Sequence, residues 1–295
     1  MCEPDTSIRQ QFETHPSVQG LPWLTQDQLL SDKTIQMVAV ESFVPRLLEF
    51  AEAAVAFGKH VHLDKPAGTD LAHFERILKA ASKKSVLIQM GYMFRYNPGF
   101  DLIRQAVTDG WLGDVYAIHA SMCTLQDDQK RKRLSYAPGG MMLELGCHLI
   151  DMIVLLLGTP DAITAYPNHH GRLDDTLADN CVTVFTYKER ATVTVETSAM
   201  EPEAFGARRF KIAGTNGTII LSPLEPPVAR IALREAAGGF PKGVTIKELP
   251  DLERHVLDFK DFARCIRGEA TFAYSSEHDY EVQKTVLLAS GMTVS

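Results

Sequence analysis

The chain has 295 residues, 45% of them hydrophobic, and a net charge of −7. This length and apolar content suit two domains, each with its own core. The acidic balance and the scattered lysines and arginines exclude a basic surface for nucleic acid, and no apolar run approaches the roughly 20 residues of a membrane span. Five cysteines, an odd number without CxxC spacing, indicate neither a disulfide framework nor a zinc site and suit a reducing cytoplasm.

The first 92 residues alternate short apolar runs, typical of buried parallel strands, with amphipathic helical patterns. They follow one another as strand 34–40, helix 45–57, strand 60–63, helix 70–82 and strand 86–91. A strand, a helix and a second strand make the parallel βαβ unit. We therefore expect residues 1–92 to form a Rossmann-like α/β domain, with a sheet of only about three strands.

After residue 92 the pattern becomes rich in β segments. Alternation in 180–188 and 191–199, with a tight link between them, predicts an antiparallel hairpin that has one solvated face. Further strands are expected at 115–124, 161–167, 207–214, 217–221, 228–234 and 244–249, and helices at 98–109, 253–267 and 276–289. We predict that residues 93–295 form an α+β domain with a large, mostly antiparallel sheet, through which the protein forms a homo-oligomer.

The segment 139–158, GGMMLELGCHLIDMIVLLLG, predicts a single buried helix that is apolar almost all round. Glu144, His148 and Asp151 follow the spacing i, i+4 and i+7, so they would share one stripe of that helix. Buried ionisable groups are costly unless they are paired or face a cleft, so the stripe is a candidate site. Glycine inside a helix costs about 1 kcal/mol relative to alanine, and close approach of a ligand would explain Gly146.

Three blocks of sequence resemble one known family. GKHVHLDKPAG at 58–68 resembles the segment GKHVxxEKP, with Asp64 in place of Glu, and GYMFRYNPGF at 91–100 resembles GYxxRxNP. GGMMLELGCHLID at 139–151 resembles GGxxxDxGxHxxD, with Glu144 in place of Asp. These patterns are those of the glucose–fructose oxidoreductase and inositol dehydrogenase (Gfo/Idh/MocA) family of NAD(P)-dependent oxidoreductases. The resemblance covers nearly the whole chain.

The sequence departs from this family near its start. The family has a strand and a glycine-rich turn, G-x-G-x-x-G, that brings the cofactor pyrophosphate to a helix N-terminus, and this sequence contains no such motif. The resemblance implies a truncated Rossmann-like domain that lacks on the order of 30 residues. It aligns Glu3 with the acid that binds the adenosine ribose. A loop containing Ser42 replaces the family's Thr-Pro loop, and we expect Ser42 to contact the cofactor.

Lys65 follows a strand, at the edge where open α/β sheets bind ligands, and Pro66 keeps it extended. The resemblance places Lys65 and Pro66 beside the nicotinamide, with Lys65 stabilising the alkoxide that forms during hydride transfer. His148 has a pKa range suited to accepting the hydroxyl proton, and Glu144 would orient the substrate and the imidazole. The resemblance also implies Arg95, Asn97 and Asp151 as substrate-binding residues.

The sequence thus predicts an oxidoreductase that moves a hydride between NAD and a sugar, polyol or related cyclic alcohol, with NADP as the other cofactor considered. If Glu3 binds the ribose, NAD is favoured, because a carboxylate repels a 2′-phosphate. One alternative is a catalytically inactive sugar-binding or interaction protein. Another is a metal-dependent lyase or hydrolase that uses the stripe in 139–158. The sequence has no HExxH motif and no metal site is expected.

Overall fold

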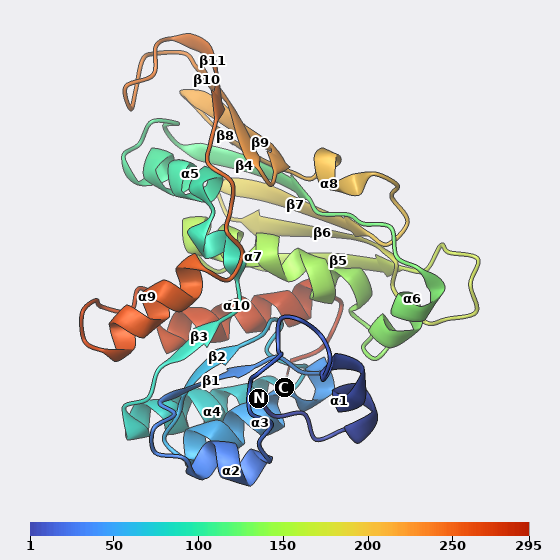
Figure 1. Ribbon diagram of the computed structural model, residues 1–295. Helices are drawn as coiled ribbons and strands as arrows, with labels where there is room; N and C mark the ends of the chain where they lie inside the picture. Colours follow the sequence, from blue (N-terminus) through green and yellow to red (C-terminus); the bar gives the residue numbers. More distant parts are fainter. Residues whose placement is uncertain (295) are drawn as a thin grey trace.

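The computed structural model describes residues 1–294, which form a small parallel sheet and a large, mostly antiparallel sheet. Figure 1 shows the small sheet in the lower half of the molecule, the large sheet in the upper half, and helices between them. The two sheets confirm the predicted fold class, a Rossmann-like parallel sheet followed by an α+β arrangement.

The small sheet has three parallel strands in sequential order. Helices α3 and α4 connect the strands and pack against each other. Residues alternate in β2, so that Val61 and Leu63 share one face and His62 lies on the other. The elements are β1 (Met37–Val40), α3 (Val44–Ala56), β2 (His60–Leu63), α4 (Leu71–Lys84) and β3 (Ile88–Met90), all close to their predicted positions.

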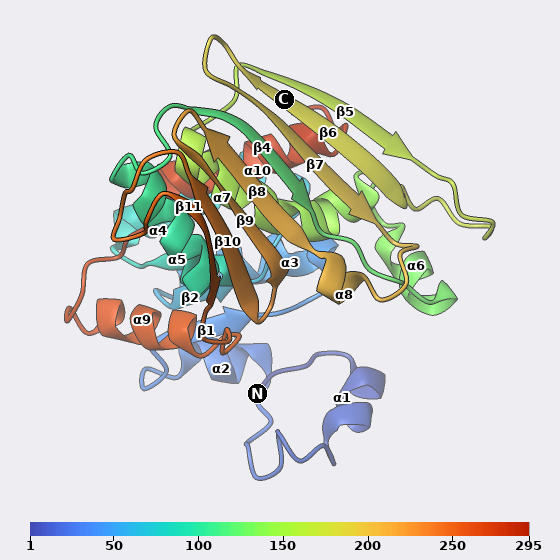
Figure 2. The ribbon, with the colours of Figure 1, turned by 90° about the horizontal axis from the view of Figure 1, so that it is seen from above.

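The large sheet has the strand order β11-β10-β9-β8-β4-β7-β6-β5, which is visible from above in Figure 2. Every neighbouring pair is antiparallel except β4 and β7, and the predicted hairpin of β6 and β7 is present. Alternate residues of β4, β6, β7 and β10 are buried, as the sequence pattern requires, whereas the edge strands β5 and β11 contain no buried residue. The strands are β4 (Val115–Ser121), β5 (Ala162–Asn168), β6 (Asn180–Tyr187), β7 (Ala191–Ser198), β8 (Arg209–Gly214), β9 (Gly217–Leu224), β10 (Pro227–Leu233) and β11 (Gly243–Glu248).

A helical layer separates the two sheets (Figure 1). It contains α5 (Pro98–Thr108), α7 (Cys147–Leu157) and α10 (Ser276–Ala289). Helix α10 contacts both α7 and α4, and its buried Gln283 bonds to the loop after β2. The amide of Gln283 donates to the carbonyl of Gly68 at 2.7 Å and accepts from the amide of Ala67 at 3.0 Å. The end of the chain therefore fixes the small sheet to the helical layer.

The segment 139–158 is not the single α-helix that its composition predicts. A π-helical turn, Met142–Gly146, precedes α7. Glu144 lies within this turn and its side chain is 22% exposed, whereas His148, in the first turn of α7, is buried. A Cβ atom on Gly146 would collide with the sulfur of Met142. Internal packing therefore gives a second explanation for this glycine, beside the ligand approach expected from the sequence.

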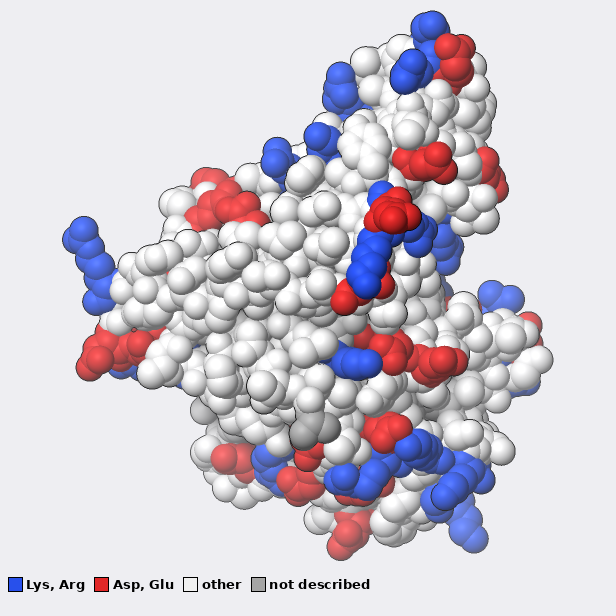
Figure 3. All heavy atoms as spheres, turned by 180° about the vertical axis from the view of Figure 1, so that it is seen from behind, with Lys and Arg blue, Asp and Glu red and all other residues white. Residues whose placement is uncertain are grey.

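Several short helices were not predicted: α1 (Thr6–Phe12), η1 (Met93–Tyr96), α6 (Asp128–Leu134) and α8 (Ala204–Ala207). A further short helix, α2 (Gln26–Ser31), precedes β1. Between residues 1 and 294, no helix combines the length and apolarity needed to cross a bilayer. All five cysteines carry free thiols. On the face seen from behind in Figure 3, basic and acidic side chains are interspersed rather than gathered by sign.

Candidate active site

A cleft of about 1220 Å³ runs along the whole of β1, an edge strand of the small sheet, and reaches the carboxyl ends of β1 and β2. Parallel sheets bind their ligands at these carboxyl ends, because loops and helix N-termini converge there. The N-terminal segment, α6 and the π-helical turn complete the walls. The charged residues that line the cleft are Glu3, Asp5, Glu41, Arg46, Asp64, Lys65, Lys130, Arg133 and Glu144.

Lys65 and Glu144 meet across this cleft, although 79 residues separate them in the sequence. The ammonium of Lys65 donates to the main-chain carbonyl of Glu144 at 2.8 Å and lies 3.4 Å from its carboxylate. Burial alone would lower the pKa of Lys65, but the neighbouring acidic groups of Cys147, Glu144 and Asp64 outweigh it and raise that pKa above its ordinary value. Lys65 is therefore a fixed positive charge at the wall of the cleft.

Asp64 lies beside Lys65 in the same wall. Its carboxylate accepts a hydrogen bond from the amide of Lys65 at 2.7 Å. Burial, together with the negative charge of Glu41, raises the pKa of Asp64 to about 6. The cleft thus contains a carboxyl group that changes charge close to neutral pH, next to a permanent cation.

His148 is buried in the first turn of α7 and is not among the residues that line the cleft. Its ring packs edge-on against Tyr92 and lies 5.4 Å from the ring of Phe94. Burial and then the charge of Lys65 hold the pKa of His148 well below its ordinary value, so the imidazole is neutral. Its Nδ1 atom has no hydrogen-bond partner among the described residues. A neutral ring with an unused nitrogen has the chemistry of a proton acceptor.

The residues expected to contact the cofactor are distributed between the cleft and the core. Glu3 and Ser42 line the cleft beside Lys65. Pro66 is buried and joined to Lys65 by a cis peptide bond. Glu3 belongs to an irregular segment rather than to the end of a strand, which is where the resemblance aligned it.

Arg95 and Asp151 form a buried ion pair away from the lining of the cleft. The guanidinium of Arg95 donates hydrogen bonds from two of its nitrogens to the carboxylate of Asp151, at 3.0 and 2.6 Å. It donates a further hydrogen bond to the carboxylate of Asp279 at 2.7 Å. It also lies over the ring of Tyr274, 4.1 Å from the centroid. All three charged side chains are at most 1% exposed. The network joins η1, α7 and α10, so its observed contacts are internal.

Asn97 also makes only internal contacts in the described chain. It caps α5 by accepting from the amide of Gly99 at 2.8 Å, and its own amide donates to the carbonyl of Leu224 at 3.0 Å. It is completely buried. Asparagine is favoured at such a position because its oxygen satisfies a free helical N–H group.

Among the cleft residues that were not singled out from the sequence are Lys130, Arg133 and Tyr136. They belong to α6 or follow it. Helix α6 has no apolar stripe by which its sequence could be recognised as helical. The one feature of the sequence that marks its start is Asp127, an N-cap whose carboxylate accepts from the amide of Lys130 at 2.8 Å. The ring of Tyr136 packs against that of Phe43, with centroids 5.3 Å apart. This contact joins the segment after α6 to the loop after β1.

Two sequence profiles of one family match this chain. The profile described as the oxidoreductase family with an NAD-binding Rossmann fold matches residues 1–92, and the Gfo/Idh/MocA C-terminal domain profile matches residues 100–220. The chain belongs to the Gfo/Idh/MocA family of oxidoreductases. This confirms the resemblance inferred from the three sequence blocks.

Curated relatives in the family include inositol dehydrogenases. Myo-inositol 2-dehydrogenase of Thermotoga maritima is 24% identical over 200 residues, which are 65% of this chain and 58% of that enzyme. The NADP⁺-dependent scyllo-inositol 2-dehydrogenase of Bacillus subtilis is 28% identical over 141 residues, which are 47% of this chain and 39% of that enzyme. The chain thus spans about half the length of the relatives it matches.

Solved structures of the family have the same fold. A 3-ketoreductase of Actinomadura kijaniata, in complex with NADP and TDP-benzene, superimposes with a TM-score of 0.73 at 20% identity, over 91% of this chain and 80% of that one. An NAD-binding protein from Listeria innocua gives a TM-score of 0.72 at 20% identity, over 90% and 82% of the two chains.

Proposed function

We propose that this protein transfers a hydride between a nicotinamide cofactor and the carbinol carbon of a sugar, polyol or related cyclic alcohol. The observation that carries the proposal is the meeting of Lys65 with Glu144 at the ligand-binding edge of the parallel sheet. Inositol and sugar-nucleotide relatives support the substrate class. The five free thiols favour a reducing compartment, and we place the reaction in the cytoplasm.

Each of three residues has a distinct part in this proposal. Lys65 donates to the reacting oxygen and stabilises the negative charge that develops on it. His148, held neutral by burial, accepts the hydroxyl proton in the oxidative direction. Glu144 positions Lys65 through its carbonyl and carboxylate. Burial of these groups strengthens their electrostatic interactions relative to those in water.

The cleft is large enough for a dinucleotide, and its lining offers both cations and carboxylates. Arg46, Lys130 and Arg133 offer cations for a pyrophosphate, and Glu3 offers a carboxylate for ribose hydroxyls. When bound, the nicotinamide supplies the site that accepts or gives the hydride. We propose NAD as the preferred cofactor, since the carboxylate of Glu3 disfavours a 2′-phosphate.

A catalytically inactive ligand-binding protein is the second candidate. The observation that favours it is the position of His148, the proposed proton acceptor, which is only 5% exposed and does not line the cleft. Under this alternative the cleft binds a sugar or polyol without binding NAD.

An assay of NADH formation distinguishes the oxidoreductase from the inactive ligand-binding protein. The purified protein is incubated with NAD⁺ and, in turn, with myo-inositol, scyllo-inositol and a panel of hexoses, and NADH absorbance is followed. We expect formation of NADH with at least one cyclic alcohol, and its loss in Lys65→Met. Calorimetric binding of an inositol without any binding of NAD⁺ or NADH would instead establish the inactive protein.

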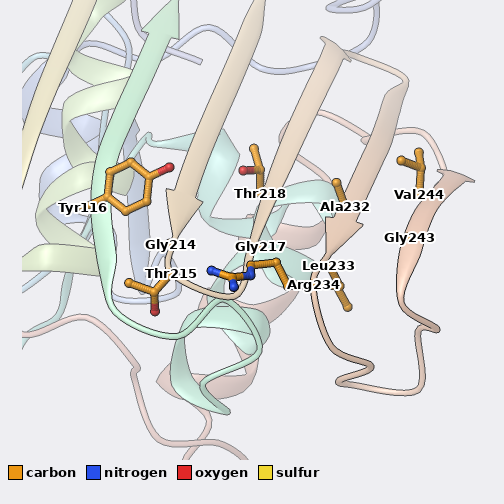
Figure 4. A pocket seen from close by; sticks show the side chains of 10 residues that line it. All are labelled: Tyr116, Gly214, Thr215, Gly217, Thr218, Ala232, Leu233, Arg234, Gly243 and Val244. Carbon is orange, nitrogen blue, oxygen red and sulfur yellow. The ribbon is translucent and has the colours of Figure 1, made fainter.

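We further propose that a second copy of this chain covers the open face of the large sheet. Tyr166 and Val182 are paired across β5 and β6, so both project from one face, and they are 54% and 39% exposed. On the other half of the sheet, Tyr116, Thr218, Ala232 and Val244 line an open hollow of about 660 Å³ (Figure 4). Exposed apolar surface of this kind commonly marks an interface.

Light scattering tests this association. We expect the wild type to have at least twice the mass of one chain. In Val182→Asp the mass should fall towards that of the monomer, because the change places a charge inside the interface. Phe57→Asp, at an exposed position after α3, is the matched control and should leave the mass unchanged. A monomeric wild type would contradict the proposal.

A further inference from the structure

A second group of ionisable side chains lies on the face of the small sheet that α3 and α4 do not cover. Helix α9 (Leu257–Ile266) packs there, and the ring of Phe259 stacks on His62 with centroids 4.3 Å apart. His62 is completely buried, yet neither ring nitrogen has a hydrogen-bond partner among residues 1–294. Buried polar groups without partners are costly, so this imidazole needs an explanation.

The partners nearest to His62 come from the beginning of α9. Its Nε2 atom lies 3.5 Å from Oδ2 of Asp258, and Nδ1 of His255 lies 3.5 Å from the same oxygen. The oxygen is itself buried and without a hydrogen bond in the described chain, while the other carboxylate oxygen accepts from the amide of Phe259 at 2.9 Å. One potential ligand atom from each residue therefore faces the same point.

We propose that His62, His255 and Asp258 bind a divalent zinc ion. Their three ligand atoms lie within 4.8 Å of one another. In a tetrahedral zinc site, bonds of about 2.0–2.1 Å separate neighbouring ligand atoms by roughly 3.3 Å, close to the two observed distances. Two imidazoles and one carboxylate are a donor set that zinc accepts, and the 50% exposed side chain of His255 leaves room for water as a fourth ligand.

Glu41 supports this assignment from the other side of the imidazole. Its carboxylate lies 3.6 Å from Nδ1 of His62. Histidine ligands of zinc usually direct their second ring nitrogen towards a carboxylate, which fixes the tautomer and directs the free lone pair to the metal. Glu41 is placed to act in this way, leaving Nε2 for the ion.

The competing interpretation is an ion pair, with a protonated His62 between Glu41 and Asp258. Charge-assisted hydrogen bonds between these groups normally measure about 2.7–2.9 Å. The observed distance of 3.5 Å between His62 and Asp258 is longer, and it suits an intervening ion on the Asp258 side. Zinc would join β2 to α9, and so fix the C-terminal part of the chain to the small sheet.

Metal titration of the whole protein decides between these interpretations. Chelator-treated protein is titrated with Zn²⁺ by calorimetry, and with Co²⁺ to record the absorption bands of a tetrahedral site. His255→Asn is the main variant, because asparagine tolerates the left-handed backbone found there, φ 61°. Asp258→Asn removes a second ligand. His73→Asn is the control, since His73 pairs with Glu52 alone, at 3.0 Å.

We expect the wild type and His73→Asn to bind one equivalent of Zn²⁺ and to melt at a higher temperature with it. His255→Asn and Asp258→Asn should bind at least about tenfold more weakly while keeping the wild-type circular dichroism spectrum. Absence of stoichiometric zinc binding by the wild type would overturn the proposal in favour of the ion pair. Equal binding by the wild type and His255→Asn would overturn it too, because the ion would then lie elsewhere.

Discussion

The ammonium of Lys65 and the main-chain carbonyl of Glu144 are joined by a hydrogen bond of 2.8 Å that links the small sheet to the π-helical turn before α7. This bond joins a charged donor from one part of the chain to the acidic residue of another, just before the helix that holds the buried imidazole of His148. The proposed chemistry depends on that meeting, because neither segment alone supplies both a stabilising cation and a proton acceptor.

Replacing Lys65 with methionine should therefore abolish most of the activity. Loss of one donor to a developing oxyanion typically lowers turnover by about 10²–10³-fold. Lys79→Met is the control, because Lys79 is exposed on α4 and pairs only with Glu75. Steady-state assays of NADH formation check the expectation, and circular dichroism shows whether each variant is folded. Wild-type turnover in Lys65→Met would show that Lys65 does not contact the reacting oxygen.

His148 should make stability depend on pH. Because burial and the charge of Lys65 lower its folded-state pKa well below 6.5, the unfolded chain takes up a proton first as the pH falls. The contribution of neutral His148 to the unfolding free energy is complete above pH 6.5. Below pH 6.5 the unfolding free energy falls by up to about 1.4 kcal/mol per pH unit, until the pH reaches the pKa of the folded state. Urea unfolding of the wild type and His148→Gln between about pH 5 and 7 measures this, and a pH-independent difference would contradict it.

The buried pair of Arg95 and Asp151 should matter far more for stability than an exposed pair. Asp151→Asn leaves the guanidinium partly uncompensated in the core and is expected to cost about 3–5 kcal/mol of unfolding free energy. Asp101→Asn is the matched control: its pair with Arg104 is about half exposed and should contribute less than about 1 kcal/mol. Urea unfolding compares the two. A fully stable Asp151→Asn protein with impaired substrate binding would instead support the substrate contact expected from the sequence.

Substitution of Gly146 tests whether packing against Met142 explains the glycine in the π-helical turn. Alanine in a helix is ordinarily better than glycine by about 1 kcal/mol, but here its Cβ would collide with Met142, so Gly146→Ala should destabilise the protein by about 1–3 kcal/mol. At Gly206 of α8, an added Cβ meets nothing within 4 Å. Gly206→Ala should therefore be neutral or stabilising. Equal melting temperatures of both variants and the wild type would refute the crowding.

The strands and helices were largely predictable from sequence, because each signal lies within a few residues. HVHL at 60–63 is a short run between a helix ending at glycine and the block DKP, and β2 occupies that run. The polar helix α6 was missed because it has no apolar stripe. The π-helical turn was also missed, since the spacing of Glu144 and His148 reads equally well as an ordinary helix.

The candidate site was only partly predictable, for a physical reason. Lys65 could be found because it follows a strand at the binding edge of a parallel sheet and because DKP resembles the EKP of the family. The internal partners of Arg95 and Asp151 could not, because Asp279 lies 184 residues from Arg95 and no local pattern links them. For the same reason nothing in the sequence joined His62 to His255 and Asp258, which come together only when α9 packs on β2.

Titration with NADH tests the central claim most directly, because every proposed role presumes that the cleft binds a nicotinamide cofactor beside Lys65. We predict saturable binding followed by NADH fluorescence, displaced by NAD⁺, and weakened in Arg133→Glu, which reverses a charge in the lining of the cleft. Lys188→Glu, at an exposed turn far along the chain, should bind as the wild type does. No saturable binding up to about 1 mM NADH, a free energy weaker than about −4 kcal/mol, would contradict the account.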